Sequence, residues 1–76
     1  MQQTNNSVQY QIFLRPPGTL RWMPSYPYEM YDKPEHALSY IKIYQQWDIK
    51  HERLRYEYCI ATVRTSYEYG EAMING

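Results

Sequence analysis

Apolar and polar residues alternate strictly over residues 8–15. One face of this stretch carries Val8, Tyr10, Ile12 and Leu14, and the other carries Gln9, Gln11, Phe13 and Arg15. A two-residue period is typical of a half-buried β-strand, because successive side chains of a strand point to opposite faces. The first predicted element is therefore a strand with one apolar face.

A turn signal follows this strand directly. In Pro16-Pro17-Gly18-Thr19, Pro17 fixes the φ angle of the second turn residue, and Gly18 supplies the positive φ that a type II turn needs next. We expect the chain to reverse there and residues 20–23 to pair back as a short second strand. Pro24 then ends this strand and places it at an edge of the sheet.

Residues 24–31 are too rich in proline for a regular strand. Their sequence, PSYPYEMY, places Tyr26, Tyr28 and Tyr31 in one loop. Loops held on a rigid scaffold often carry binding residues. We interpret these tyrosines as candidate contacts for a ligand or partner, with a lid over one end of the core as the alternative.

The clearest helical signal starts at Asp32. Asp32 and Glu35 have the spacing of a capping box, and Pro34 is tolerated in the first turn because its missing N–H would have no partner there. A broad apolar arc with a helical period follows, made of Ala37, Tyr40, Ile41, Ile43, Tyr44 and Trp47. The period fades after Trp47, so we expect one amphipathic helix that ends near Lys50.

The longest β pattern covers residues 53–66. One face carries Leu54, Tyr56, Tyr58 and Ile60. The opposite face begins polar, with Arg53, Arg55 and Glu57, and then becomes apolar, with Cys59, Ala61 and Val63. We expect a strand that is covered first on one side and later on both, through a bulge or an intermolecular contact.

Together these elements predict an α+β fold, a small antiparallel three-stranded sheet in the order β-β-α-β with one amphipathic helix packed on one face. Residues 8–69 form the single domain, residues 1–7 a disordered lead and residues 70–76 a flexible tail. Three strands leave one sheet face thinly covered and one edge open. The apolar arc of the helix is also wider than one small sheet needs. We therefore expect a homodimer, with an interface formed by Tyr40, Ile43, Trp47, Ala61 and Val63.

The charge balance narrows the range of expected partners. Eight basic residues balance eight acidic ones in 76 residues, so no net charge attracts the protein to nucleic acid or to a membrane. The sequence has no apolar run long enough to span a membrane, and the single Cys59 cannot form a disulfide within the chain. We expect a cytoplasmic protein with no membrane association.

The sequence carries no recognisable catalytic or metal-binding signature. His36 and His51 lack the spacing of a zinc motif, and the glycines are too scattered for a phosphate-binding loop. Cys59 lies in mid-strand, where a free thiol commonly behaves as a small hydrophobic group rather than as a nucleophile. We therefore predict that the protein is not an enzyme and uses no metal or cofactor.

Arginines interleaved with aromatic residues are the remaining candidate chemistry. Guanidinium groups recognise carboxylates and phosphates, and aromatic rings stack on bases. The predicted ligand- or partner-binding residues are Arg15, Arg21, Trp22, Tyr26, Tyr28, Tyr31, Arg53 and Arg55. Solvated pairs of Arg53 or Arg55 with Glu57 are the plain alternative.

The tyrosine content favours an interaction surface. The chain has ten tyrosines and one phenylalanine. Tyrosine is enriched at interfaces, where its ring is buried and its hydroxyl stays in contact with water. Our first hypothesis is a small non-enzymatic binding protein that acts stoichiometrically, either blocking a protein partner or sequestering a small anionic or nucleotide ligand. Small inhibitors made by phages and mobile elements have this profile. The alternatives are a single-stranded nucleic-acid-binding protein, which zero net charge disfavours, and a structural subunit of a larger assembly.

Overall fold

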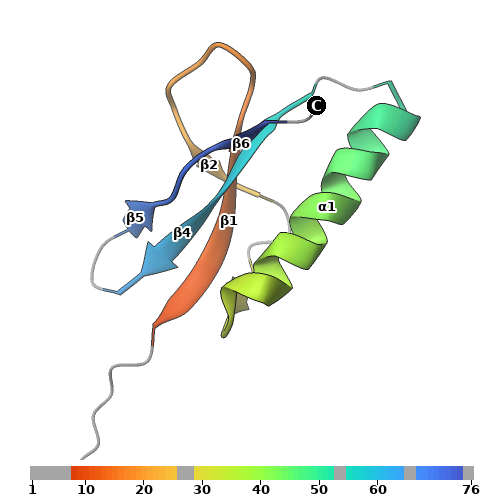
Figure 1. The fold of residues 1–76 in the computed structure, drawn as a ribbon. Coiled ribbons are helices and arrows are strands. Elements are labelled where there is room, and N and C mark those ends of the chain that lie inside the picture. The colour runs from red at the N-terminus through yellow and green to blue at the C-terminus, as the bar shows by residue number, and fades with distance from the viewer. Residues whose placement is uncertain (1–7, 26–28, 53–54, 65–66, 75–76) are drawn as a thin grey trace, which may run out of the picture.

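The computed structural model describes residues 8–25, 29–52, 55–64 and 67–74, which form two layers (Figure 1). One layer is an antiparallel sheet, and the other is the helix α1 (Pro34–Lys50), which lies across one face of that sheet. The strands are β1 (Gln9–Arg15), β2 (Met23–Pro24), β3 (Met30–Tyr31), β4 (Glu57–Val63), β5 (Tyr67–Tyr69) and β6 (Met73–Ile74). The predicted α+β class, with one helix on an antiparallel sheet, is confirmed.

The two long strands, β1 and β4, form the centre of the sheet. They pair over their full length, from Gln9 opposite Val63 to Arg15 opposite Glu57. The short strands β2 and β3 pair with β1, and β5 and β6 pair with β4. The sequence predicted only three of these strands. β3, β5 and β6 are two or three residues long, and a run of that length is too short to show a period.

The turn after β1 forms where the sequence predicts it. Gly18 has a φ of +83°, and both the backbone N–H and the hydroxyl of Thr19 donate to the Pro16 carbonyl, at 3.2 and 2.8 Å. The returning strand begins later than predicted, at Met23, and it includes Pro24, which lies opposite Phe13. Its predicted edge position is confirmed, since β2 lies at one end of the strand order.

The start of α1 differs from the predicted capping box. The N-cap is Lys33, whose backbone is extended, and no side chain caps the helix there. Pro34 explains the shift, because a residue before proline is driven to the extended conformation that an N-cap requires, and proline itself suits the first helical position. Asp32 therefore lies one residue outside the cap position, and the capping-box prediction is wrong.

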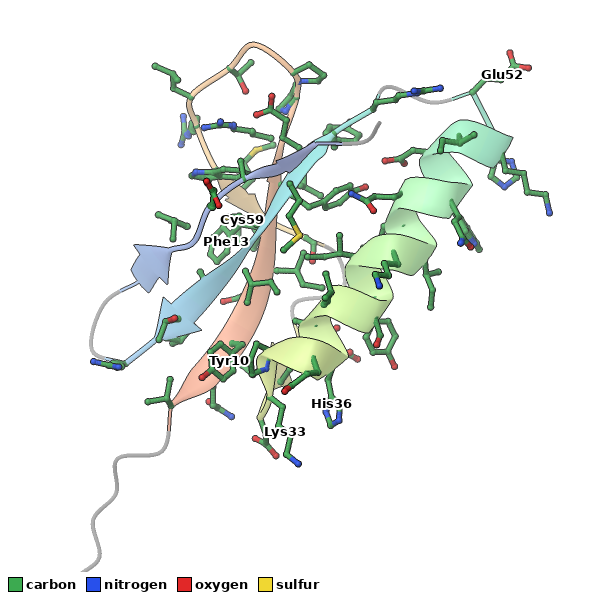
Figure 2. The ribbon with its side chains drawn as sticks, in the orientation of Figure 1. Tyr10, Phe13, Lys33, His36, Glu52 and Cys59 are labelled. Carbon is green, nitrogen blue, oxygen red and sulfur yellow. The ribbon has the colours of Figure 1, made fainter. Side chains whose placement is uncertain are left out.

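The predicted end of the helix near Lys50 is confirmed. The N–H of His51 donates to the Trp47 carbonyl at 2.9 Å, and Glu52 leaves the helix with a φ of +53°. Figure 2 shows Lys33 and His36 at the first end of α1 and Glu52 beyond the other. Within the described ranges, α1 is too short and too polar to cross a membrane, and no other helix is present.

Two small apolar clusters, one on each face of the sheet, form the core. The cluster under α1 contains Ile12, Ala37, Ile41 and Tyr58, with partly buried neighbours that include Leu14, Tyr44, Tyr56 and Ile60. The cluster on the opposite face contains Phe13, Cys59 and Ala61, with Trp22 packed against it; Figure 2 shows Phe13 and Cys59 side by side. This second cluster explains why the second face of β4 becomes apolar at Cys59. Side chains of the same chain cover that face, so no intermolecular contact is needed to account for the pattern.

The chain after β4 folds back onto it instead of continuing as one long strand. β5 returns antiparallel, with Tyr69 opposite Ala61, and β6 pairs Met73 with Tyr58. The segment predicted as a flexible tail, residues 70–76, thus contributes a short strand to the sheet. The side chain of Met73 packs against the cluster under α1, which gives this segment an apolar anchor that a tail without periodicity does not reveal.

A close backbone approach at Gly70 joins β5 to β4. The Gly70 N–H donates to the Ile60 carbonyl at 3.1 Å, and a Cβ at Gly70 would lie 2.9 Å from the same oxygen. We expect Gly70→Ala to lower the free energy of unfolding by about 1–3 kcal/mol, because backbone atoms must move to admit the methyl group. Urea denaturation measures this loss, with the exposed neighbour Glu71→Ala as the control. Equal unfolding midpoints for the two variants would contradict the close approach.

Candidate functional site

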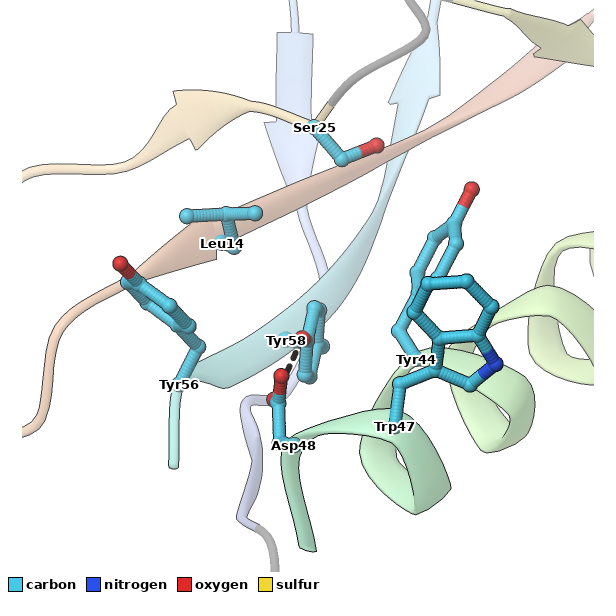
Figure 3. Close-up of a pocket in the computed structure, with 7 residues that line it drawn as sticks. All are labelled: Leu14, Ser25, Tyr44, Trp47, Asp48, Tyr56 and Tyr58. Carbon is cyan, nitrogen blue, oxygen red and sulfur yellow. Dashed lines mark hydrogen bonds between the residues drawn. The ribbon is translucent and has the colours of Figure 1, made fainter. Parts of the chain in front are cut away.

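An aromatic cleft opens between α1 and the adjoining ends of the central strands. Its volume is about 190 Å³. We name it the aromatic cleft after its described lining, which consists of Leu14, Ser25, Tyr44, Trp47, Asp48, Tyr56 and Tyr58. Figure 3 shows Tyr56 on one side, Tyr44 and Trp47 on the other, and Tyr58 with Asp48 between them. Four of the seven residues are thus aromatic, contributed by α1, by β4 and by the segment before β4.

The floor of the cleft is a buried hydrogen bond between α1 and β4. The Tyr58 hydroxyl donates to Asp48 Oδ2 at 2.7 Å, and the two residues are only 3% and 4% exposed. Burial raises the pKa of Tyr58 well above its usual value, and its hydrogen bond to the Asp48 carboxylate raises it further. The phenol therefore stays protonated and keeps donating to the carboxylate.

Tyr44 forms the wall of the cleft next to this floor. Its ring centroid lies 6.1 Å from that of Tyr58. Burial raises the pKa of Tyr44 as well, with a smaller contribution from the nearby Glu29 carboxylate. The wall and the floor therefore present neutral phenol groups, and the described charge in the lining is the Asp48 carboxylate.

Large side chains continue from the cleft along the exposed side of α1. Tyr40, Ile43 and Trp47 are 43%, 46% and 52% exposed, and we call these three residues the α1 flank. Ring contacts hold both ends of the flank: Tyr40 lies 5.3 Å from Tyr31, and Trp47 lies 5.5 Å from His51. Because Trp47 belongs to both features, the α1 flank and the aromatic cleft form one continuous surface.

The residues predicted for a dimer interface divide into three groups. Tyr40, Ile43 and Trp47 present exposed apolar surface, as an interface of that kind requires. Ala61 is fully buried within its own chain, beside Phe13, so it has no surface to offer a second subunit; this corrects the expectation for Ala61. Val63 is half-buried at the end of β4.

The structure brings together two of the predicted binding residues, Arg15 and Trp22, on the sheet face opposite α1. The Arg15 guanidinium lies 4.2 Å from the centre of a Trp22 ring, and its Nε donates to Glu57 Oε1 at 2.6 Å. Trp22 in turn stacks on Tyr69, at 6.2 Å between centroids. The charge of Arg15 is therefore compensated within the chain.

The other predicted binding residues do not join this pair. Arg21 and Arg55 are exposed, and Tyr31 is half-buried with its hydroxyl 3.3 Å from Glu29 Oε1. Burial, with contributions from Tyr44 and Glu29, raises the pKa of Tyr31 above its usual range. The remaining three predicted positions, Tyr26, Tyr28 and Arg53, lie outside the described residues.

Cys59, the candidate nucleophile, lies on β4, whereas the two histidines that could bind a metal lie near the ends of α1. Cys59 is fully buried, and this burial raises the pKa of its thiol to about 11, so the reactive thiolate is disfavoured. His36 and His51 are exposed near opposite ends of α1. Within the ranges that the structure describes, no three His, Cys, Asp or Glu side chains gather in a way that could hold a metal ion.

Sequence reasoning missed Asp48 as a site residue, although the sequence carries its signal. At 100° per residue, Asp48 falls in the same arc of α1 as Ala37 and Ile41, and all three are buried. A carboxylate on the apolar face of a helix needs a hydrogen-bonding partner, and an unusual tyrosine content makes a phenol the natural one. That Tyr58 is the partner follows only from the tertiary fold.

No protein-family model matches the chain, and neither the curated proteins nor the solved structures give a significant match.

Proposed function

We propose that this chain is a non-enzymatic binding protein that acts stoichiometrically and docks a protein partner on the α1 flank and the aromatic cleft. The observation that carries the proposal is the continuous surface of Tyr40, Ile43 and Trp47 with the cleft beside it. Tyrosine and tryptophan are the side chains that most often dominate binding energy at protein interfaces, especially next to a pocket. An exposed tryptophan at the rim of an aromatic cleft has this arrangement.

A protein partner accounts for this surface better than a small anionic ligand does. The described cleft lining has an acidic side chain and no basic one. On the other sheet face, the charge of Arg15 is already balanced by Glu57. The aromatic cleft therefore offers aromatic contact area rather than a site for phosphate or carboxylate. The expected action as an inhibitor and the cytoplasmic location stay predictions.

A comparison of two helix variants tests the proposal. Trp47 and Ile49 are similarly exposed, at 52% and 48%, but two residues along a helix turn by about 200°, so the two side chains leave α1 on opposite sides. We expect wild type and Ile49→Ala to retain the same protein from a lysate of the host cell and Trp47→Ala to lose it. Native mass spectrometry of the purified complex should give one partner per chain or per dimer. Equal retention by both variants, or retention of no protein, would refute the proposal.

A second copy of this chain is the competing occupant, because the predicted homodimer uses the same α1 flank. Analytical ultracentrifugation of wild type and Trp47→Ala separates the two cases. A dimer that Trp47→Ala converts to a monomer, together with no foreign protein retained, would assign the flank to self-association instead.

A further inference from the structure

We infer that the sheet face opposite α1 binds single-stranded nucleic acid. This activity is separate from the proposed docking of a protein on α1, because it uses the other layer of the molecule. Two features carry it: the division of charge between the two layers, and the exposed arginines and aromatic side chains of the sheet layer.

The zero net charge of the chain conceals two layers of opposite charge. Residues 29–52, which contain α1, hold five acidic residues and three lysines, a net charge of −2. The rest of the chain, which contains both central strands of the sheet, holds five arginines and three acidic residues, a net charge of +2. Charges more than about 8 Å apart are largely screened at physiological ionic strength, so each layer acts on its own side. The sheet layer therefore attracts anions although the chain as a whole is neutral.

The exposed arginines of the sheet layer lie at both ends of β4. Arg55 precedes this strand and Arg64 follows it, and the nine residues between their positions correspond to about 30 Å of extended chain. Arg21 lies in the loop after β1, whose last residue is opposite the first residue of β4, so Arg21 shares the end of Arg55. Within the described ranges, all three arginines are exposed and none of them forms an ion pair. Their guanidinium groups are thus available to phosphates at both ends of the face.

Aromatic side chains lie on the same sheet face. Trp22 and Tyr69 stack there at 6.2 Å between ring centroids, and Tyr69 meets the Phe13 ring edge-on at 5.0 Å. Tyr69 keeps both of these contacts and is still 46% exposed, so the surface that it offers a base is surface already in contact with solvent. No helix or strand of the described residues lies over this face (Figure 1). An unpaired base can therefore extend the existing aromatic stack.

A single strand matches this combination better than a duplex or an acidic protein does. Proteins that bind single strands combine positive side chains along the backbone with aromatic side chains on which bases stack. The bases of a duplex are already paired and stacked on one another, so their faces are not available to Tyr69. The carboxylates of an acidic protein would pair with the arginines but would leave the rings unused. Because every base has an aromatic face, we expect little sequence preference.

The test is a fluorescence-anisotropy titration of labelled oligonucleotides with the purified full chain. The probes are oligothymidylate and oligouridylate of about 15 nucleotides, which distinguish DNA from RNA as the source of the strand. The matched controls are a DNA duplex of the same length and poly-glutamate of similar charge. We expect one or both single strands to bind at least about fivefold tighter than either control, the effect of stacking one base. Binding should weaken about tenfold between about 50 and about 200 mM salt, as three phosphate contacts require.

Matched charge variants assign the binding to the sheet layer. Arg21→Gln and Arg64→Gln should each weaken single-strand binding about threefold and reduce the slope of log affinity against log salt by about 0.7. Lys42→Gln removes the same charge from α1 and should change neither quantity. All three side chains are exposed, so these variants should fold. Tyr69→Leu should reduce the preference for a single strand over the duplex to about twofold or less, because it removes the ring.

Three results would overturn the inference. Absence of saturable binding to both single strands would show that the face does not take this ligand. Poly-glutamate bound as tightly as the single strands would assign the arginines to an acidic protein. Equal losses for Lys42→Gln and Arg64→Gln would show that the sheet layer has no special role. None of these substitutions changes a residue of the α1 flank, so failure here is distinguishable from failure of the proposed function, which Trp47→Ala and Ile49→Ala test.

Discussion

Replacing Ile41 by alanine should lower the free energy of unfolding by about 3 kcal/mol, a typical cost for truncating a buried isoleucine. Ile41 is fully buried in the cluster that joins α1 to the sheet. Single domains of this size have a stability of only about 5–10 kcal/mol, so the loss is a large fraction of the total. Removing three carbon atoms here leaves a cavity under the helix.

The same substitution at Ile43 is the matched control for this experiment. Ile43 lies two residues along the same helix but is 46% exposed, so Ile43→Ala should change the free energy of unfolding by less than about 0.5 kcal/mol. Urea denaturation followed by circular dichroism measures both variants. Similar losses for the two would mean that α1 packs on the sheet through a different face.

Asp48→Ala should also destabilise the fold, with a loss of about 1–3 kcal/mol in the free energy of unfolding. The substitution leaves the Tyr58 hydroxyl buried without the acceptor that it has now at 2.7 Å. Tyr58→Phe leaves the carboxylate of Asp48 buried without this donor and should also destabilise the fold. The double variant should cost less than the sum of the two single variants, because the two groups satisfy each other. An additive double-mutant cycle would show that the bond contributes nothing.

The Tyr58 hydroxyl also predicts how stability depends on pH. Burial raises the pKa of Tyr58 in the folded state above the value of about 10 that a tyrosine has when unfolded. Its contribution is fully present below pH 10 and is lost as the pH rises above 10, because the unfolded chain then releases the proton more readily. Tyr58→Phe should flatten this alkaline loss by up to about 1.4 kcal/mol per pH unit. An unchanged alkaline slope in the variant would contradict the raised pKa.

The parts of the fold that the sequence predicted are those with a clear period. The alternation from Gln9 to Arg15 and the helical arc from Ala37 to Trp47 each define an element, and both elements are present. Their buried faces were predicted only in part, because Gln11 and Phe13 are buried on the strand face that was predicted to be polar, and half of the helical arc is exposed. The helix start was misplaced by one residue because the capping-box spacing and the effect of Pro34 on Lys33 compete. Two-residue strands such as β3 and β6 show no period, so the sequence could not predict them.

The candidate site was predicted only in part because it depends on tertiary contacts. Tyr40, Ile43 and Trp47 were predicted as part of a dimer interface from the excess width of the apolar arc, and all three are exposed. The cleft beside it was not predicted, since Leu14 and Tyr56 meet only after β1 and β4 have paired. Arginines and aromatic residues were expected to share the binding chemistry, but the pairing of β1 with β4 places Arg15 opposite Glu57.

We propose that Trp47, at the junction of the α1 flank and the aromatic cleft, anchors a protein partner. The most direct measurement is the dissociation constant of the recovered partner for wild type, Trp47→Ala and Ile49→Ala, by isothermal titration calorimetry. We expect about thirtyfold weaker binding for Trp47→Ala, because a hot-spot tryptophan contributes about 2 kcal/mol, and a change of less than about twofold for Ile49→Ala. Equal affinities for the two variants would contradict it.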